Sequence, residues 1–374
     1  MSDPPSALGA LRDEIAAIDR AIAEAIARRL AVARQVGSVK AETHEPTRDY
    51  EVEALVMARW REALEPTGIA PGRAEALARW MVEESVRVQQ TSSGSGPRGE
   101  GADPQEISIV GGAGAMGRWL AAYFEDLGRR VVVVDPRAGS TGRPSYPDVE
   151  TAVARSDVVL FATPIRGTAP LLRRALAVPS RALIGDVLSV KAPIEELLRR
   201  AVADGRRVTS LHPMFGPSAR TLSGRNLLIV SCGCPEADRE ARALFAGSAL
   251  SIAEVPLDRH DRLIAESLGL AHAVNLLFLA ALAADPASPH DLAQAASTTF
   301  HRQSSLARTV ADEGAELYLD IQALNPHSRG MYRELRGALD RLSGIVERGD
   351  LPSFAALLDS GTRKLEPGTE PMRT

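Results

Sequence analysis

The sequence predicts an α/β protein in three parts: an all-helical first region, a central parallel sheet with crossover helices, and an all-helical last region. Three observations predict this fold class. Apolar residues recur every three or four positions in residues 1–91. Short β-branched runs alternate with helical stretches over 107–256, which is typical of a parallel sheet. Long helical patterns without strands fill 257–374, and a Gly-, Ser- and Pro-rich linker occupies 92–106.

Composition excludes several classes of protein. The net charge of −4 argues against a nucleic-acid partner. Cys232 and Cys234 form neither a disulfide framework nor a zinc pattern, so we expect no metal. Residues 1–9 lack the features of a signal peptide, and the apolar segment 268–284 carries polar residues that favour a buried helix over a membrane span. We therefore expect a cytoplasmic protein with no membrane partner.

The first region is expected to contain three helices, at about 8–40, 49–64 and 72–90, separated by Pro46 and by Pro66. One apolar stripe of the first helix comprises Leu8, Leu11, Ile15, Ile18, Ile22 and Ile26. So long a helix cannot bury this stripe against two short ones. Helix exchange or dimerisation would bury it, so we expect a homodimer.

The expected strands of the central sheet lie at 107–110, 131–135, 158–162, 183–187, 208–211 and 227–230. Residues 107–117 read ISIVGGAGAMG, in which Gly112, Gly114 and Gly117 form a G-x-G-x-x-G motif between a strand and a helix. The first glycine permits a tight turn, the second a close approach of pyrophosphate, and the third helix–strand packing. Met116, in the first helical turn, belongs to the same expected Rossmann-type site.

The second strand of the motif ends in Asp135. Its carboxylate can accept hydrogen bonds from the ribose hydroxyls and would repel a 2′-phosphate, which favours NAD over NADP. Arg137 leaves NADP open, because an arginine there can hold the extra phosphate. The sequence therefore predicts an NAD-dependent dehydrogenase.

Polar residues follow two further strands at the edge where the cofactor is expected. Ser189 and Lys191 come after 183–187, and His212 begins the run HPMFGP after 208–211. A histidine held in this stiff loop is suited to accept a hydroxyl proton during hydride loss. The alternative is a purely structural histidine.

The run GGAGAMGR, the segment LSVK and above all HPMFGP resemble prephenate dehydrogenase. The helical first region resembles the all-helical class of chorismate mutase. Together, in this order, they resemble the bifunctional chorismate mutase–prephenate dehydrogenases of tyrosine biosynthesis. The resemblance implies chorismate and prephenate as substrates, and oxidative decarboxylation to 4-hydroxyphenylpyruvate.

The resemblance also implies roles for the dehydrogenase residues. His212 accepts the hydroxyl proton, Ser189 holds that hydroxyl or positions the histidine, and Lys191 orients substrate or cofactor. Arg308 binds a substrate carboxylate and His272 lies near the substrate side chain. The alternatives for these last two are a solvated helix arginine and a satisfied core histidine.

Chorismate rearrangement needs a cage of cations rather than a nucleophile or a base. The resemblance implies a site made of Arg12 from the partner subunit, Arg29, Lys40, Asp49, Glu53, Ser85 and Gln89. Arg29 and Lys40 lie on one helix face, about three turns apart. Arg29 binds a carboxylate, Lys40 and Gln89 meet the ether oxygen, and Glu53 holds the ring hydroxyl.

One position departs from the family pattern. Val52 stands where the family has an arginine, and Arg48 lies one turn upstream. The loss of a cation leaves three alternatives open: a weaker mutase, a 4-amino-4-deoxy substrate analogue, or a dehydrogenase whose first region only dimerises or senses an effector. A general 3-hydroxyacid dehydrogenase is disfavoured because HPMFGP is not its motif.

Overall fold

The computed structural model describes residues 7–43, 50–92, 105–219, 222, 225–246, 248, 250–312 and 314–365. The chain divides into two compact units, Met1–Leu257 and Asp258–Thr374. Each unit is described by itself below.

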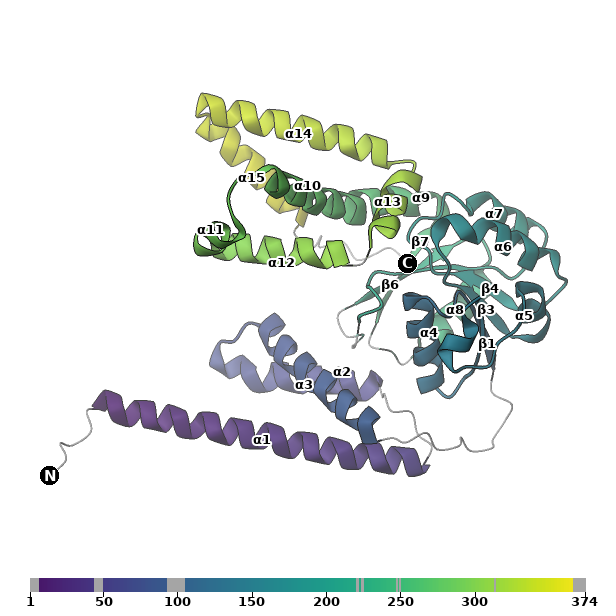
Figure 1. The fold of residues 1–374 in the computed structure, drawn as a ribbon, viewed down its shortest axis with the longest axis horizontal. Helices are drawn as coiled ribbons and strands as arrows, with labels where there is room; N and C mark the ends of the chain where they lie inside the picture. The colour runs from purple at the N-terminus through teal and green to yellow at the C-terminus, as the bar shows by residue number, and fades with distance from the viewer. Residues whose placement is uncertain are drawn as a thin grey trace. The chain divides into compact units, whose positions relative to one another are not determined.

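Three helices form the first region: α1 (Ala7–Thr43), α2 (Tyr50–Leu64) and α3 (Pro71–Ser92), with a 3₁₀ turn, η1 (Glu65–Thr67), between the last two. Both α1 and α2 pack against α3, and the first half of α1 runs beyond them (Figure 1). Residues Leu8, Leu11, Ile15, Ile18 and Ile22 are between 51% and 59% exposed. The stripe predicted to need a partner is therefore uncovered within one chain.

The first sheet is parallel, with the strand order β2-β1-β3-β4. Its strands are β1 (Glu106–Val110), β2 (Arg130–Val134), β3 (Val158–Phe161) and β4 (Leu183–Asp186). The connecting helices are α4 (Ala115–Asp126), α5 (Val149–Arg155) and α6 (Ile165–Ala177), with a 3₁₀ turn, η2 (Ala138–Thr141), after β2. Every residue of β3 is buried, as expected of a strand covered on both faces.

A second sheet, in the order β5-β6-β7, replaces the continuous parallel sheet that the sequence predicted. It comprises β5 (Ser210–Pro213), β6 (Asn226–Ser231) and β7 (Ser251–Pro256). In chain order, α7 (Glu195–Ala203) precedes β5, and α8 (Pro235–Leu244) connects β6 with β7. β5 runs antiparallel to β6 and starts two residues later than expected. The half-exposed β7 was missed because its residues form no apolar run.

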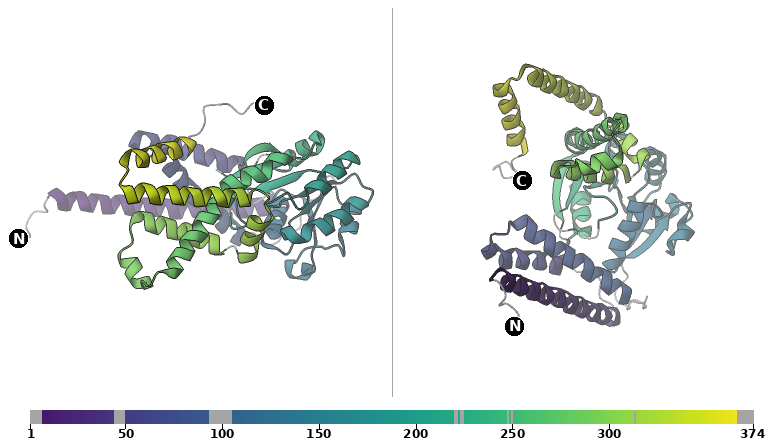
Figure 2. Two further views of the ribbon diagram at one scale, coloured as in Figure 1. Left: turned by 90° about the horizontal axis from the view of Figure 1, so that it is seen from above. Right: turned by 60° about the vertical axis from the view of Figure 1, so that its left-hand side comes forward.

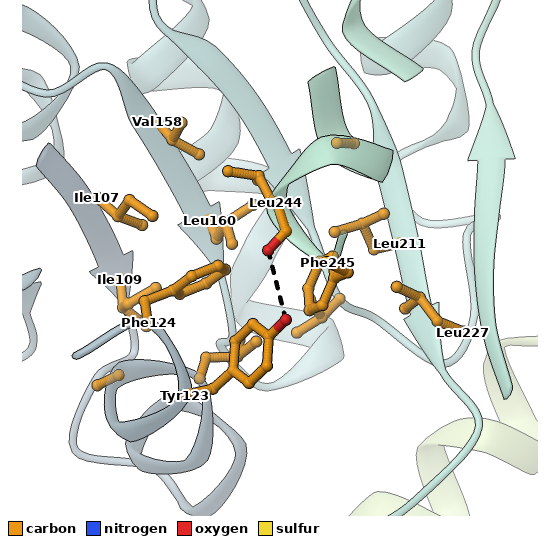
Figure 3. Packing of buried hydrophobic residues seen from close by; sticks show 14 of the residues in the cluster. Ile107, Ile109, Tyr123, Phe124, Val158, Leu160, Leu211, Leu227, Leu244 and Phe245 are labelled. Atoms are coloured by element: carbon orange, nitrogen blue, oxygen red, sulfur yellow. Dashed lines mark hydrogen bonds between the residues drawn. The ribbon is translucent and has the colours of Figure 1, made fainter. Parts of the chain in front are cut away.

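The two sheets share one hydrophobic core. Ile107 and Leu160 of the first sheet lie in the same cluster as Leu211 and Leu227 of the second (Figure 3). Tyr123 of α4 stacks on Phe245, and its hydroxyl donates a hydrogen bond to the Leu244 carbonyl at 3.4 Å. The shared core packs the second sheet against α4, the helix that follows the loop between β1 and α4.

The second unit is helical, as predicted. Its helices are α9 (Leu257–Ile264), a π-helical segment η3 (Ala265–Gly269), α10 (Leu270–Ala284), α11 (Pro289–Gln294), α12 (Thr298–Asp312), α13 (Ala315–Leu324), α14 (Ser328–Arg348) and α15 (Leu351–Leu365). The chain turns from α14 into α15 at Gly349, which has a φ of 61° (Figure 2).

The apolar α10 differs from the buried helix that was expected, because only Ala273 and Asn275 of it are buried within the chain. Leu257–Ala284 is long and apolar enough to cross a membrane by length and composition, with 22% of its most apolar window buried. Most of the apolar surface of α10 is therefore exposed, and Asn275 is its one buried polar residue. Burial of this surface needs contacts that a single chain does not supply.

Candidate functional site

The glycine loop between β1 and α4 is built by close backbone contacts. A Cβ atom on Gly117 would lie 2.2 Å from the Gly111 carbonyl oxygen, and one on Gly112 would lie 2.5 Å from Val133 Cγ1. Gly114 begins α4, and among the described residues no side chain caps this helix start. The loop therefore leaves backbone N–H groups for a phosphate at a helix N-terminus.

One glycine was overlooked in the sequence. Gly111, not Gly112, has the left-handed backbone, with a φ of 86°, and a Cβ there would lie 2.6 Å from the Ala162 carbonyl oxygen. The tight turn assigned to Gly112 thus belongs to Gly111. The doubled glycine after the strand was the feature that could have revealed it.

Asp135 anchors the end of the loop. Its Oδ2 accepts a hydrogen bond from the Ala113 N–H at 3.1 Å, and its Oδ1 accepts one from the Arg137 N–H at 2.8 Å. The Arg137 side chain lies outward, with its Nε 3.9 Å from Asp135 Oδ1 and 73% of the side chain exposed. Met116 is half-buried against the core. The glycine loop leaves a space that side chains at its glycines would fill. This loop therefore fits a dinucleotide, with Asp135 as the acid at the ribose position.

His212 lies on β5 and is 2% exposed, while Ser189, in the loop after β4, is half-buried. The HPMFGP loop is also tied to α4. Trp119 donates an indole hydrogen bond to the Ala219 carbonyl at 2.9 Å, and its ring meets the edge of Phe215 at 5.1 Å between centroids. The helix whose N-terminus would bind the pyrophosphate therefore also packs against the loop that follows the candidate base.

Lys191 is fully buried. Its Nζ donates hydrogen bonds to Asp186 Oδ1 and to the Leu211 carbonyl, both at 2.7 Å. Both side chains of this ion pair are 1% exposed. The ammonium that the sequence suggested for substrate or cofactor is therefore used inside the protein, and Asp186, its partner, was missed.

In the second unit, His272 of α10 meets the edge of Tyr318 of α13 at 4.4 Å between ring centroids. Burial lowers the pKa of His272 to about 4, so the ring is neutral at physiological pH. Its Nδ1 is buried without a hydrogen-bond partner among the described residues. Arg308 of α12 is exposed, which is compatible both with binding of an anion and with a solvated helix arginine.

The helical first region brings Arg29 and Ser85 together. Arg29 donates hydrogen bonds to the Ser85 hydroxyl and, at 3.1 Å, to the Met81 carbonyl. The Ser85 hydroxyl in turn donates to the same carbonyl at 2.7 Å. Burial lowers the pKa of Arg29 below its ordinary value. A partly desolvated cation fixed in this way is suited to bind a carboxylate.

Three other expected mutase residues, Lys40, Glu53 and Gln89, lie on the same three helices. A Cβ on Gly37 of α1 would lie 2.9 Å from the Gln89 Cα, so the helices approach closely at Gln89. Glu53 of α2 is 5% exposed, whereas Val52 beside it is 50% exposed. Lys40 is half-buried on α1. Asp49 and Arg48 lie outside the described residues.

Arg12 is exposed and sits about 25 Å along α1 from Arg29, at about 1.5 Å per residue. The two guanidinium groups of one chain therefore cannot meet in one small-molecule site. A symmetric partner that supplies Arg12 is the arrangement this spacing favours.

No group of three or more His, Cys, Asp or Glu suited to a metal occurs in the described part of the chain. A glycine loop suited to a pyrophosphate at a helix N-terminus, with an acid at the ribose end, is the arrangement typical of one class of protein: NAD-dependent dehydrogenases. Ahead of it lies a helical region with a fixed, partly buried arginine.

Comparisons with known proteins identify both parts. Residues 11–90 match the chorismate mutase type II family, and residues 143–229 match the prephenate dehydrogenase nucleotide-binding domain. The 4-amino-4-deoxyprephenate dehydrogenase of Streptomyces pristinaespiralis is 34% identical over 265 residues, 67% of this chain and 87% of that protein. The chain belongs to the prephenate dehydrogenase family, as a bifunctional chorismate mutase–prephenate dehydrogenase that uses NAD.

Two further comparisons describe the whole arrangement. The T-protein of Enterobacter agglomerans is 24% identical over 350 residues, which covers 93% of this chain and 90% of that protein. The crystal structure of prephenate dehydrogenase from A. aeolicus, in complex with hydroxyphenyl propionate and NAD+, has a TM-score of 0.58 at 17% identity. It covers 71% of this chain and 98% of that one, and this likeness is one of fold.

Proposed function

We propose that His212 is the base of an oxidative decarboxylation at the end of β5. The observation that carries this proposal is the position of a buried histidine on β5, directly before a loop that packs on the α4 helix. NAD supplies the hydride acceptor when it is bound at the glycine loop. The substrate C4 loses hydride, and its hydroxyl loses a proton to His212. The ring carboxylate then leaves as CO2, the electrons of the broken C–C bond make the ring aromatic, and the C4 oxygen takes the proton back from His212 as the phenol hydroxyl.

Other residues bind and orient in this proposal. Ser189 holds the C4 hydroxyl or the ring of His212. Arg308 binds a substrate carboxylate, and the neutral His272 lies beside the substrate side chain. Gly112, Gly114, Met116, Gly117 and Asp135 form the cofactor site.

Replacement of His212 by asparagine tests the role of the base. The amide keeps much of the shape but cannot take the proton, so we expect kcat to fall by about 100-fold or more. The rate is measured as NADH formation from prephenate, and NAD binding is measured beside it as a control for folding. Near-normal turnover would refute the role of His212.

For the mutase we propose a cage in which Arg29 and Lys40 bind the dianion and Gln89 and Glu53 contact the ether oxygen and ring substituent. Ser85 and Asp49 complete the wall, and Arg12 enters from the partner subunit. The spacing along α1 and its uncovered apolar stripe support a homodimer. We further propose that the enzyme is cytoplasmic and acts without a nucleic-acid or membrane partner.

A second candidate substrate has a ring amine in place of the hydroxyl. It is favoured by Val52, which removes a cation next to Glu53, and by the 34% identity to a 4-amino-4-deoxyprephenate dehydrogenase. A cationic amine beside Glu53 needs a less positive wall than a hydroxyl does.

The two substrates are separated by a direct comparison. Prephenate and 4-amino-4-deoxyprephenate are supplied with NAD, and chorismate and its amino analogue without it. On the amino hypothesis, Val52→Arg raises chorismate turnover and lowers turnover of the amino analogue, each by about 10-fold, the effect of one well-placed charge. A wild-type preference for chorismate and prephenate would contradict it.

A further inference from the structure

The loop that carries Ser189 and the strand that carries His212 both follow the junction of the two sheets. There the strands are joined by one isolated bridge, between Ile184 and Val208. The last backbone hydrogen bond across the junction runs from the Thr209 N–H to the Ile184 carbonyl at 3.0 Å. Among the described residues, no strand ladder continues from there to His212.

The buried ion pair spans the gap beyond that bond. Asp186 Oδ1 accepts hydrogen bonds from Lys191 Nζ at 2.7 Å and from the Leu188 N–H at 3.0 Å. Lys191 Nζ also donates to the Leu211 carbonyl at 2.7 Å, in the peptide unit that leads into His212. One ammonium thus connects the loop of Ser189 with the backbone of His212.

Stability alone explains this pair poorly. Removal of two charges from water is unfavourable, and apolar residues of similar volume often stabilise a core as well or better. Asp186 Oδ2 is also buried without a hydrogen-bond partner in the part of the chain that the structure describes. A pair that is incompletely satisfied is better explained by the geometry it imposes.

We propose that Asp186 and Lys191 are positioning residues, which hold the Ser189 loop and the His212 strand in register for the reaction. Lys191 is buried with its ammonium bonded to protein oxygens, so it acts through His212 rather than on the substrate. The inference rests on the proposed role of His212 and assigns to Lys191 a function different from substrate binding.

The test is steady-state kinetics of the full-length enzyme with prephenate and NAD. The main variant is Asp186→Asn/Lys191→Met, which removes both charges and leaves none unpaired. We expect kcat to fall by about 100-fold, as a displacement of about 1 Å can cause, while KM and the affinity for NAD change by less than about threefold. A raised KM with unchanged kcat would overturn the proposal in favour of substrate binding, and an unchanged kcat and KM would overturn it outright.

Asp186→Asn alone is the conservative variant, since its amide oxygen still accepts a hydrogen bond from Lys191 Nζ. This variant keeps the hydrogen bond between residue 186 and Lys191, so it serves as a test if the double variant does not fold. We expect its kcat to stay within about fivefold of the wild type. A loss as large as that expected for the double variant would show that charge rather than position matters, and would overturn the proposal.

Asp238→Asn is the matched control. Asp238 of α8 is 5% exposed, and it accepts hydrogen bonds from Thr209, directly before β5, at 3.0 Å and from Ser231 of β6 at 2.6 Å. It is therefore a buried acid that is hydrogen-bonded to the same part of the second sheet. We expect its kcat to stay within about twofold of the wild type. A fall equal to that of the double variant would mean that any damage to these strands slows the reaction, and would overturn the proposal.

The double change is also made in a His212→Asn background. If the pair acts through His212, the remaining rate falls by less than about threefold there. A full additional loss would overturn the proposal. A high rate in His212→Asn alone would instead refute the proposed base, so the two failures are distinguishable.

Discussion

At the scale of single residues, burial sets the chemical state of His272. Desolvation lowers its pKa from 6.5 to about 4, and its ring lies against Tyr318. A neutral imidazole can accept or donate a hydrogen bond next to a polar substrate group without adding charge. The lowered pKa of His272 also makes the stability of the second unit depend on pH under acidic conditions.

The pH dependence of stability follows from that shift. Between about pH 4 and pH 6.5 the unfolded chain binds a proton at His272 that the folded chain does not, so stability falls as the pH falls through this window. We expect His272→Asn to reduce the difference in melting temperature between about pH 5 and about pH 7. Thermal melts of both proteins at the two pH values measure this. An undiminished difference would show that other groups cause it.

Some residues were predictable from sequence and others were not. Gly112, Gly114 and Gly117 were predicted because their spacing is tied to a backbone requirement, and the structure shows close contacts at Gly112 and Gly117. Asp135 was predicted from its place at the end of the expected second strand, and it directly follows β2. Asp186 was not predicted, since a carboxyl at the end of a strand gives no sign that a buried lysine will meet it. Lys191 was expected to orient substrate or cofactor because of its segment's resemblance to the family, and lysine is rarely buried, so nothing in the sequence indicated its burial.

At the scale of elements, the glycine loop and the first turn of α4 act as one rigid unit. A methyl group at Gly117 would collide with the Gly111 carbonyl at 2.2 Å, and backbone cannot move aside cheaply. We expect Gly117→Ala to weaken NAD binding by about 10-fold or more through loss of the pyrophosphate geometry.

The affinity for NAD is measured by titration, with the melting temperature recorded beside it. Gly167→Ala is the control, because no atom lies within 4 Å of a Cβ at that helical position. Normal NAD affinity in Gly117→Ala would contradict the role of the loop.

The strands show where sequence patterns stop being informative. The four strands of the first sheet were predicted to within a residue at each end, because buried parallel strands are continuous apolar runs. β5 was misplaced by two residues and given the wrong direction, since its partner β6 follows a long loop rather than a crossover helix. Pairing direction depends on tertiary contacts that the local sequence does not contain.

At the scale of the whole molecule, exposed apolar helix faces support the homodimer proposed above. The stripe on α1 and the apolar face of α10 are both uncovered in one chain. Ile15 and Ile22, 59% and 53% exposed, belong to the stripe on α1.

We expect Ile15→Glu/Ile22→Glu to lower chorismate turnover by about 10-fold or more, because the partner's Arg12 no longer reaches the site. Prephenate oxidation should be retained. Light scattering reports the oligomeric state, and the two activities are assayed in parallel. Full mutase activity in a monomeric variant would contradict a shared site.

The contacts of Arg29 have a consequence for the temperature dependence of the mutase. Ser85 and the Met81 carbonyl hold its guanidinium in place before any ligand arrives. On its proposed role, Arg29 binds a substrate carboxylate. A pericyclic rearrangement consumes no protein group, so a cation that is already oriented toward that carboxylate need not be reorganised when the dianion is compacted. The advantage over the reaction in water should therefore appear largely in the activation entropy, and loss of the Ser85 hydroxyl should make that entropy more negative.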